Sequence, residues 1–286
     1  MIYDKSGNLL HSIYDKNGDA LSSGYDSEGQ QIYLSVPITI KVMTYNVGQW
    51  YYGSGDNVPA NKDADYYNLQ NGMIQRNNPD VLVIQEYWKQ FSKLPRTALS
   101  MLQQYFPYIH EQGGDSGYFG RCICSKYPIS NYVVRTYTDN NQRYYDSCTI
   151  TVGGIPITFT NTHLDVNSQD NRDAEIIQLI GYLAGQEWFV ACGDYNTAIT
   201  SSDKTQEAWI HNIKPFIDAG FHIANCDDEF YFTSSNYPDG TWNGCLDNII
   251  VSPNITIQSV TVDETKRTDN LPERIDHMPL IAVLQL

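Results

Sequence analysis

Two stretches of this chain have the pattern of a strand and end in ionisable side chains. They constrain the fold more than any other feature. Residues 155–162 alternate β-branched or aromatic residues with small polar ones, the pattern of a strand with one face in a core. His163 and Asp165 follow where the strand becomes a loop. About thirty residues later the apolar run 189–192 ends in Gly193-Asp194-Tyr195-Asn196. Two strands that end in this way predict one shared site.

Other predicted strands also end in polar residues. Strand 38–45 ends at Asn46, and strand 80–85 ends at Glu86. The whole set, in chain order, is Asn46, Glu86, His163, Asp194 with Asn196, Asp247, and Asp276 with His277. Each member alone also fits a turn residue or a hydrogen-bonded structural residue. Their joint occurrence at strand ends favours a functional site.

Helical spacing of apolar residues predicts helices over residues 63–76, 94–105, 171–184 and 206–218. Gly153-Gly154 separates two strand patterns and indicates a hairpin. Mixed strands and helices with hairpins predict an α/β protein built as a four-layer sandwich. Two mixed, mostly antiparallel sheets would pack face to face, with helices outside.

The N-terminus carries an internal repeat. Tyr-Asp-x-x-Gly begins at Tyr3, Tyr14 and Tyr25, a spacing of 11 residues, and each copy is a turn signal between short strand patterns. We therefore predict a small β-hairpin appendage over residues 1–36 and a catalytic domain over residues 37–286. The appendage could be a simple β extension, or a module that binds an unknown partner or another copy.

A calcium loop in the repeat region is disfavoured. Asp15, Asn17 and Asp19 have the spacing of its first ligands, but the glycine falls directly after Asn17 and no glutamate closes the loop.

Composition excludes some classes of function. With 33 acidic and 18 basic residues the formal charge is −15, which argues against tight, non-specific binding to nucleic-acid backbone. Hydrolysis of a phosphodiester stays open, because a divalent cation can supply positive charge in the site. No apolar run has the roughly 20 residues of a membrane span, and the start has no apolar signal core. A cytoplasmic location and release from the cell both remain open.

The six cysteines are few for 286 residues and form no CxxC pair. Buried free thiols are therefore favoured over a disulfide framework, with one or two bridges left open.

The residue types at the strand ends suit one kind of chemistry. Glu86 and Asp276 are hard oxygen ligands for Mg²⁺ or Mn²⁺, whereas zinc would require nitrogen or sulfur ligands at a spacing that is absent. Asn46 and Asn196 are neutral groups that can hold a phosphate or a metal-bound oxygen. A carboxylate could hold His277 in one tautomer, and Asp247 is the candidate.

In these motifs the chain resembles the endonuclease/exonuclease/phosphatase superfamily, which has the deoxyribonuclease I-like fold. The matching segments are Met43-Thr44-Tyr45-Asn46-Val47, Pro79-Asp80-Val81-Leu82-Val83-Ile84-Gln85-Glu86, Asn161-Thr162-His163-Leu164, Gly193-Asp194-Tyr195-Asn196, Leu246-Asp247-Asn248-Ile249-Ile250-Val251 and Ile275-Asp276-His277-Met278-Pro279-Leu280. No single motif is specific to this superfamily, but the occurrence of all six in this order is. Together the six motifs span the chain except for the N-terminal repeats.

The resemblance implies a metal-dependent phosphoester hydrolase, above all a phosphodiesterase of the nuclease type. It implies that Glu86 binds Mg²⁺ or Mn²⁺ with Asn46 and Asp276 close by. Asp194 would orient or deprotonate the attacking water, and Asn196 would contact the phosphate. Two histidines complete the implied site: His277, supported by Asp247, as base or phosphate ligand, and His163, which steadies the phosphate or protonates the leaving oxygen.

Departures from the family pattern bear on the substrate. Ile275 stands where members commonly have Ser, and Tyr87-Trp88 follow Glu86 where the deoxyribonuclease branch has an arginine nearby. Arg143 could replace that charge at the phosphate or form a surface salt bridge. DNA is the expected substrate; a sphingomyelinase-like or small-molecule phosphatase activity is the alternative. In a different class, the chain would be a non-catalytic binding protein that acts through its repeats.

Overall fold

The computed structural model describes residues 3–6, 8, 23–25, 27–33, 37–48, 60–90, 96–114, 120–138, 143–235, 243–265 and 277–286. The chain forms two compact units, Met1–Thr39 and Ile40–Leu286. Asp276, the second repeat and the residues of the disfavoured calcium loop lie outside the described residues.

The N-terminal unit contains an antiparallel hairpin of β1 (Ser23–Tyr25) and β2 (Gln31–Tyr33). Tyr3 of the first repeat pairs with Tyr25 of the third, through backbone hydrogen bonds of 2.8 and 2.9 Å. Asp4 forms the turn predicted for its repeat, because its Oδ1 accepts hydrogen bonds from the backbone N–H groups of Ser6 and Asn8. The predicted β-hairpin segment is therefore present.

Two sheets form the larger unit. One has the strand order β14-β15-β3-β4-β6-β5 and the other β11-β13-β10-β9-β8-β7, with β12 paired to β13. The strands of the first are β3 (Thr39–Asn46), β4 (Val81–Tyr87), β5 (Tyr108–Gln112), β6 (Gly120–Ser125), β14 (Thr256–Val262) and β15 (Leu280–Gln285). Those of the second are β7 (Ile129–Thr136), β8 (Tyr144–Val152), β9 (Ile155–His163), β10 (Phe189–Ile199), β11 (His222–Ile223), β12 (Ser234–Ser235) and β13 (Asn243–Val251).

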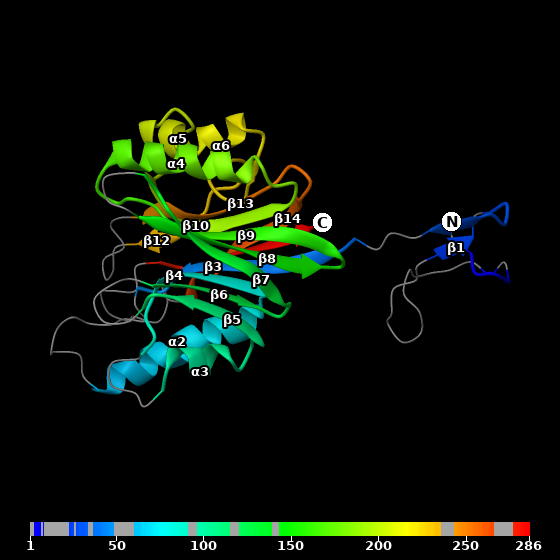
Figure 1. Ribbon diagram of the computed structural model, residues 1–286, viewed down its shortest axis with the longest axis horizontal. Coiled ribbons are helices and arrows are strands. Elements are labelled where there is room, and N and C mark those ends of the chain that lie inside the picture. The colour runs from blue at the N-terminus through cyan, green and yellow to red at the C-terminus, as the bar shows by residue number, and fades with distance from the viewer. Residues whose placement is uncertain are drawn as a thin grey trace. The chain divides into compact units, whose positions relative to one another are not determined.

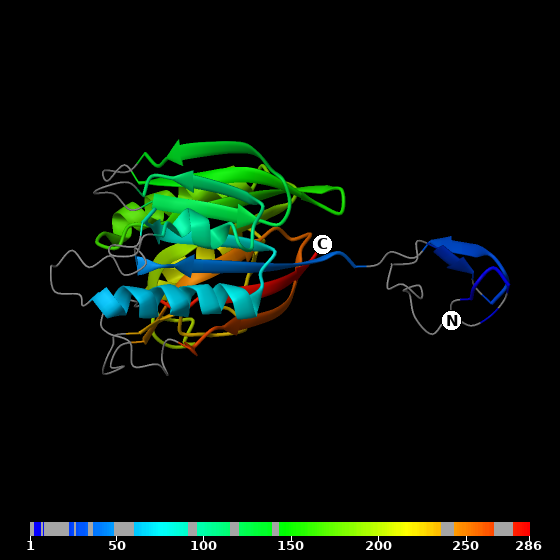
Figure 2. The ribbon, with the colours of Figure 1, turned by 90° about the horizontal axis from the view of Figure 1, so that it is seen from below.

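Helices cover the outer face of each sheet (Figures 1 and 2). On one side lie α2 (Ala60–Asn77) and α3 (Ala98–Leu102), and on the other α4 (Gln169–Leu183), α5 (Glu207–Asn212) and α6 (Lys214–Asp218). The predicted four-layer α/β sandwich is confirmed.

Strand alternation divides the side chains between these layers. In β4, Leu82 and Ile84 belong to the apolar cluster that contains Met73 and Ile74 of α2. Gln85 points the other way and donates from Nε2 to Asn161 Oδ1 of β9 at 2.8 Å. Since successive side chains of a strand point to opposite faces, β4 contributes both to a helix-facing core and to the layer between the sheets.

Two helix predictions are wrong in detail. Of the helix predicted over residues 94–105, the described residues contain only α3, which begins after its N-cap Thr97 and ends before Gln103. Residues 206–218 form two short helices, α5 and α6, because Ile213 leaves helical geometry at φ −115° and Pro215 follows in the first turn of α6. Proline lacks the N–H of a continuous helix and crowds the preceding turn.

The cysteines are of two kinds. Cys226 and Cys245 form a disulfide, and the other four are free and buried. Within the described residues, no helix is long and apolar enough to span a membrane.

Candidate active site

A β-bulge places Glu86 in the candidate site. In the β4–β6 register, Ile84 pairs with Cys122 and Tyr87 with Gly120, so that two residues of β4 face one of β6. Glu86 has a φ of +50°, a left-handed conformation that is costly for a residue with a Cβ. Bulges redirect side chains. Here Glu86 Oε1 accepts a hydrogen bond of 3.2 Å from Asn46 Nδ2, at the end of neighbouring β3.

A second irregularity lies in the Gly193-Asp194-Tyr195-Asn196 motif of β10. The pairing of β10 with β13 shifts register between Asp194 and Ile199, and Asn196 has a φ of +49°. Gly193 is required for close packing, because a Cβ there would lie 2.4 Å from the carbonyl oxygen of Thr162 on β9. The glycine thus lets β10 approach β9, which carries His163.

Asp194 lies at the centre of the cluster. Its Oδ2 accepts a hydrogen bond of 3.0 Å from Asn46 Nδ2. The same oxygen lies 3.5 Å from Nε2 of His163 and 3.5 Å from Nε2 of His277. Three distant segments of the chain, which belong to both sheets, therefore converge on one buried carboxylate.

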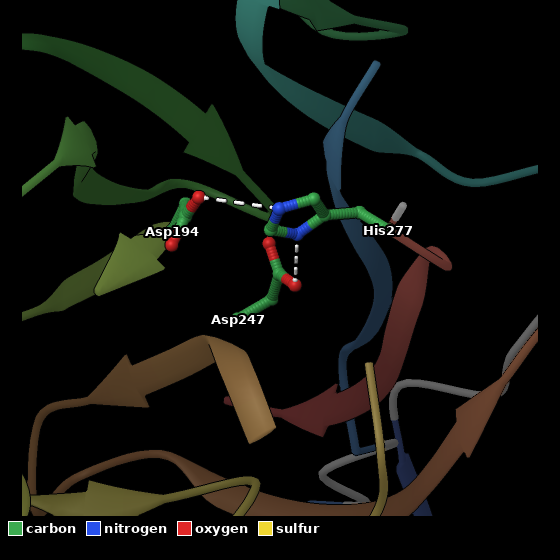
Figure 3. Close-up of side chains that lie close together, drawn as sticks. All are labelled: Asp194, Asp247 and His277. Atoms are coloured by element: carbon green, nitrogen blue, oxygen red, sulfur yellow. Dashed lines mark hydrogen bonds and ion pairs between the residues drawn. The ribbon is translucent and has the colours of Figure 1, made fainter. Parts of the chain in front are cut away.

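His277 also contacts a second carboxylate. Its Nδ1 lies 2.8 Å from Oδ2 of Asp247, as Figure 3 shows. A carboxylate at Nδ1 selects the tautomer with the proton on that nitrogen and leaves Nε2 to act as acceptor. The predicted partnership of Asp247 and His277 is present in the geometry.

Thr233 supports this pair, and the sequence analysis did not identify it. Its Oγ1 accepts the backbone N–H groups of Leu246 and Asp247, each at 3.0 Å, and its carbonyl oxygen accepts the N–H of Met278 at 2.6 Å. Thr233 thus joins the strand of Asp247 to the segment of His277. The local sequence Phe232-Thr233-Ser234 has no pattern that could reveal this contact.

Burial changes the acid–base properties of two members. Burial raises the pKa of Asp194 to about 7; His277 opposes this rise and Asp247 adds to it. Burial, followed by the positive charges of Arg143 and Arg121, lowers the pKa of His163 well below its ordinary value. At neutral pH, His163 is therefore a neutral imidazole that can donate a hydrogen bond.

Two predicted phosphate-binding residues contact the backbone beside His163. Asn196 donates from Nδ2 to the carbonyl of Leu164 at 2.8 Å. Arg143 donates from Nη1 to the carbonyls of His163 and Leu164, at 3.0 and 2.6 Å. Asp165 forms the turn that precedes α4, since its Oδ1 accepts the N–H groups of Asn167 and Ser168. These contacts hold the loop in place, and phosphate binding by Asn196 and Arg143 stays a prediction.

The donor atoms suit a hard divalent cation. Glu86 presents a carboxylate near the end of β4, while Asn46 donates from Nδ2 to Glu86 and Asp194 and accepts the N–H of Gly48 at Oδ1. A Mg²⁺ site needs few protein oxygens because it keeps several waters. A second group of possible ligands is close by: Asp194, Asp247 and His277 each offer one ligand atom, and these atoms lie within 4.8 Å of one another. We favour the Glu86 side, because Asp247 and Nδ1 of His277 already bond to each other.

A cavity of about 560 Å³ lies away from this cluster. Its lining includes Phe221, Ile223, Asp227, Ile257 and Val260, and none of the predicted site residues.

Comparisons with known proteins give the family and the fold. Residues 43–277 match the sequence model of the Endonuclease/Exonuclease/phosphatase family. No curated protein matches the chain.

Solved structures share the fold at low sequence identity. Humanized D. rerio TDP2 is 15% identical with a TM-score of 0.64, covering 87% of this chain and 99% of that one. An AP endonuclease from Archaeoglobus fulgidus is 20% identical with a TM-score of 0.59, covering 85% and 98%. The 3′ phosphatase NExo from Neisseria, bound to a product DNA hairpin, is 19% identical with a TM-score of 0.59, covering 85% and 98%.

Proposed function

Since the chain belongs to the endonuclease/exonuclease/phosphatase family, we propose that it is a Mg²⁺- or Mn²⁺-dependent phosphodiesterase. The observation that carries the proposal is the convergence of Asn46, His163 and His277 on the buried carboxylate of Asp194. A carboxylate with a pKa of about 7 can accept a proton from water near neutral pH. This arrangement suits attack by water on phosphorus.

The side chains then have distinct tasks. Asp194 orients the attacking water and accepts its proton. His277, fixed by Asp247, accepts a hydrogen bond at Nε2 or binds the phosphate. His163, neutral because its pKa is lowered, donates a hydrogen bond to a phosphoryl oxygen rather than a proton to the leaving group.

The cation would be held by Glu86 and Asn46, together with the predicted ligand Asp276. When bound, it supplies positive charge to the phosphate oxygens as the transition state forms.

DNA is the proposed substrate. The AP endonuclease and the DNA-bound 3′ phosphatase that share the fold support it. The formal charge of −15 favours contacts with a few phosphates of the DNA backbone over an extended basic surface that binds many of them. A phospholipid head group or a small phosphomonoester is the alternative.

The decisive test is nicking of supercoiled plasmid with Mg²⁺ by the wild type and by Asp194→Ala and His163→Ala. We expect nicking by the wild type and little or none by the variants. If the wild type hydrolyses sphingomyelin vesicles or p-nitrophenyl phosphate but does not nick the plasmid, the substrate is one of the alternatives and not DNA. If the protein hydrolyses none of these phosphoesters, the proposed phosphodiesterase function is wrong.

We also propose residues 1–36 as a separate appendage that binds a partner or a surface. Its observed strands have three residues each, and such short hairpins are marginally stable alone. Deletion of residues 1–36 should leave hydrolysis unchanged. Loss of activity in a folded deletion variant would contradict this division.

A further inference from the structure

Gln85 of β4 and Asn161 of β9 form a hydrogen bond between the two sheets. Nε2 of Gln85 donates to Oδ1 of Asn161 at 2.8 Å. Asn161 contacts β4 a second time, because its Nδ2 donates to the backbone carbonyl of Ile84 at 2.9 Å. The two strands belong to sheets that face each other (Figure 1). Gln85 and Asn161 are therefore called the inter-sheet pair.

The inter-sheet pair is completely buried, and further contacts orient both side chains. Gln85 and Asn161 are each 0% exposed. Nε2 of Gln85 also donates to Oγ1 of Thr44 on β3 at 3.2 Å, and Nδ2 of Asn161 donates to the carbonyl of Cys122 on β6 at 3.4 Å. Buried hydrogen bonds are directional and costly to leave unmade, whereas apolar burial has no preferred direction. The pair therefore fixes β4 relative to β9 more closely than apolar packing alone can.

Each member of the pair stands close in the chain to a residue of the candidate site. Gln85 directly precedes Glu86, and its carbonyl accepts the N–H of Val47 at 3.1 Å. Asn161 precedes His163 by two residues on the same strand. Because residues two apart in a strand share a face, His163 leaves β9 on the face that Asn161 fixes. The pair thus connects the backbone at Glu86 with the backbone at His163.

The candidate site is itself divided between the two sheets. Asn46 and Glu86 belong to β3 and β4 of the first sheet, and His163 and Asp194 belong to β9 and β10 of the second. The two halves meet in the hydrogen bond of 3.0 Å from Asn46 Nδ2 to Asp194 Oδ2. This contact keeps its length only if the sheets keep their relative position. A displacement of about 1 Å in a reacting group can reduce turnover about a hundredfold.

Resting on the proposed phosphodiesterase activity, we propose that Gln85 and Asn161 are positioning residues for that reaction. They hold Glu86, on the metal-binding side of the site, at a fixed position relative to His163 and Asp194. Neither side chain touches the substrate, because both are fully buried. A change in the pair should therefore disturb the alignment of the catalytic groups and leave metal binding by the first sheet in place.

The test replaces each amide by an apolar side chain of similar shape, in Gln85→Met, Asn161→Leu and the double variant. Steady-state kinetics use Mg²⁺ and a labelled DNA duplex, or whichever alternative phosphoester the wild type hydrolyses. We expect kcat to fall about ten- to a hundredfold in each single variant, with KM within about threefold of the wild-type value. Because the two residues act as one unit, the double variant should lose no more than about threefold beyond the less active single variant.

Gln186→Met is the matched control. Oε1 of Gln186 accepts a hydrogen bond of 3.0 Å from Thr158 Oγ1, so this variant also removes a glutamine that bonds β9, but far along the strand from His163. Its kcat should equal that of the wild type.

A purely structural role for the pair predicts something different. When all proteins are assayed well below their Tm, so that nearly every molecule is folded, Gln85→Met and Asn161→Leu would then keep a kcat within about twofold of the wild type. That result would overturn the proposal, as would a double variant in which the two losses of kcat multiply. If these variants do not fold, Gln85→Asn keeps a buried amide but shortens its reach by one methylene, and the same fall in kcat is expected.

Crystal structures separate this inference from the proposed function. In Gln85→Met, the distance from Asn46 Nδ2 to Asp194 Oδ2, which is 3.0 Å in the wild type, should exceed the range of a hydrogen bond. In Gln186→Met it should stay unchanged. The longer distance, together with no hydrolysis of any phosphoester by the wild type, would reject the proposed activity but retain the positioning role of the pair. An unchanged distance in Gln85→Met would overturn that role even if the wild type is an active phosphodiesterase.

Discussion

Asp194 and Asp247 are cross-strand partners in the antiparallel pair of β10 and β13. Directly opposed residues of a sheet share one face, so two carboxylates are brought together in a buried region. His277 lies between them, with Nδ1 2.8 Å from Asp247 and Nε2 3.5 Å from Asp194. The imidazole therefore contacts two acidic side chains. Asp247 fixes the tautomer of His277, and Asp194 lies beside its Nε2.

Asp247→Asn tests this link. An amide can present its N–H₂ to Nδ1 and so stabilise the tautomer with the proton on Nε2, which no longer accepts a hydrogen bond there. We expect kcat to fall by about 10²–10⁴-fold, with the Mg²⁺ affinity retained. Steady-state kinetics with a metal titration measure both. The exposed Asp228→Asn is the matched control. A kcat within twofold of wild type would show that Asp247 does not control the tautomer.

The raised pKa of Asp194 predicts a pH dependence of stability in metal-free protein. The pKa is about 7 when folded and 3.8 for an ordinary aspartate, so the folded chain keeps a proton that the unfolded chain loses between these pH values. Stability from this group is complete below about pH 4 and is lost as the pH rises through 7. Asp194→Asn, which cannot ionise, should be more stable than wild type at pH 8 by about 1–3 kcal/mol.

Urea unfolding in EDTA at pH 5 and pH 8 measures this difference. Only the part of the pH dependence that disappears in Asp194→Asn belongs to Asp194, because Asp146 also has a raised pKa. An equal change between pH 5 and pH 8 in both proteins would show that Asp194 is ionised throughout.

Much of the site could be predicted from sequence because its residues stand at strand ends, where a local pattern fixes their position. Asp194 and His163 follow apolar runs, and parallel β9 and β10 then bring them side by side. Thr233 was missed for the opposite reason. It acts through contacts between segments that are distant in sequence, and a single Thr in its own segment carries no signal. The bulge at Glu86 is likewise set by pairing with β6.

Metal binding can be measured without turnover. A ligand that binds only the folded state stabilises it, by about 2.7 kcal/mol at one hundred times its dissociation constant. Mg²⁺ should therefore raise the Tm of the wild type. Glu86→Gln should weaken this response, because an amide oxygen is a poorer ligand for a hard cation than a carboxylate oxygen. Glu187→Gln, which changes an exposed glutamate, is the control. An undiminished rise in Glu86→Gln would place the cation elsewhere.

Gly193→Ala tests whether close packing of β9 and β10 positions the site. A Cβ at residue 193 would lie 2.4 Å from the Thr162 carbonyl oxygen and 2.6 Å from Thr162 Cγ2, so one strand must move. We expect a loss of about 1–3 kcal/mol in the free energy of unfolding. Activity should fall further than stability accounts for, because Asp194 would shift relative to His163. Gly181→Ala in α4 is the matched control. Nothing lies within 4 Å of its added Cβ, and alanine should stabilise this helix by roughly 0.5–1 kcal/mol. Equal stability of Gly193→Ala and wild type in urea unfolding would show that the two strands can separate at no cost.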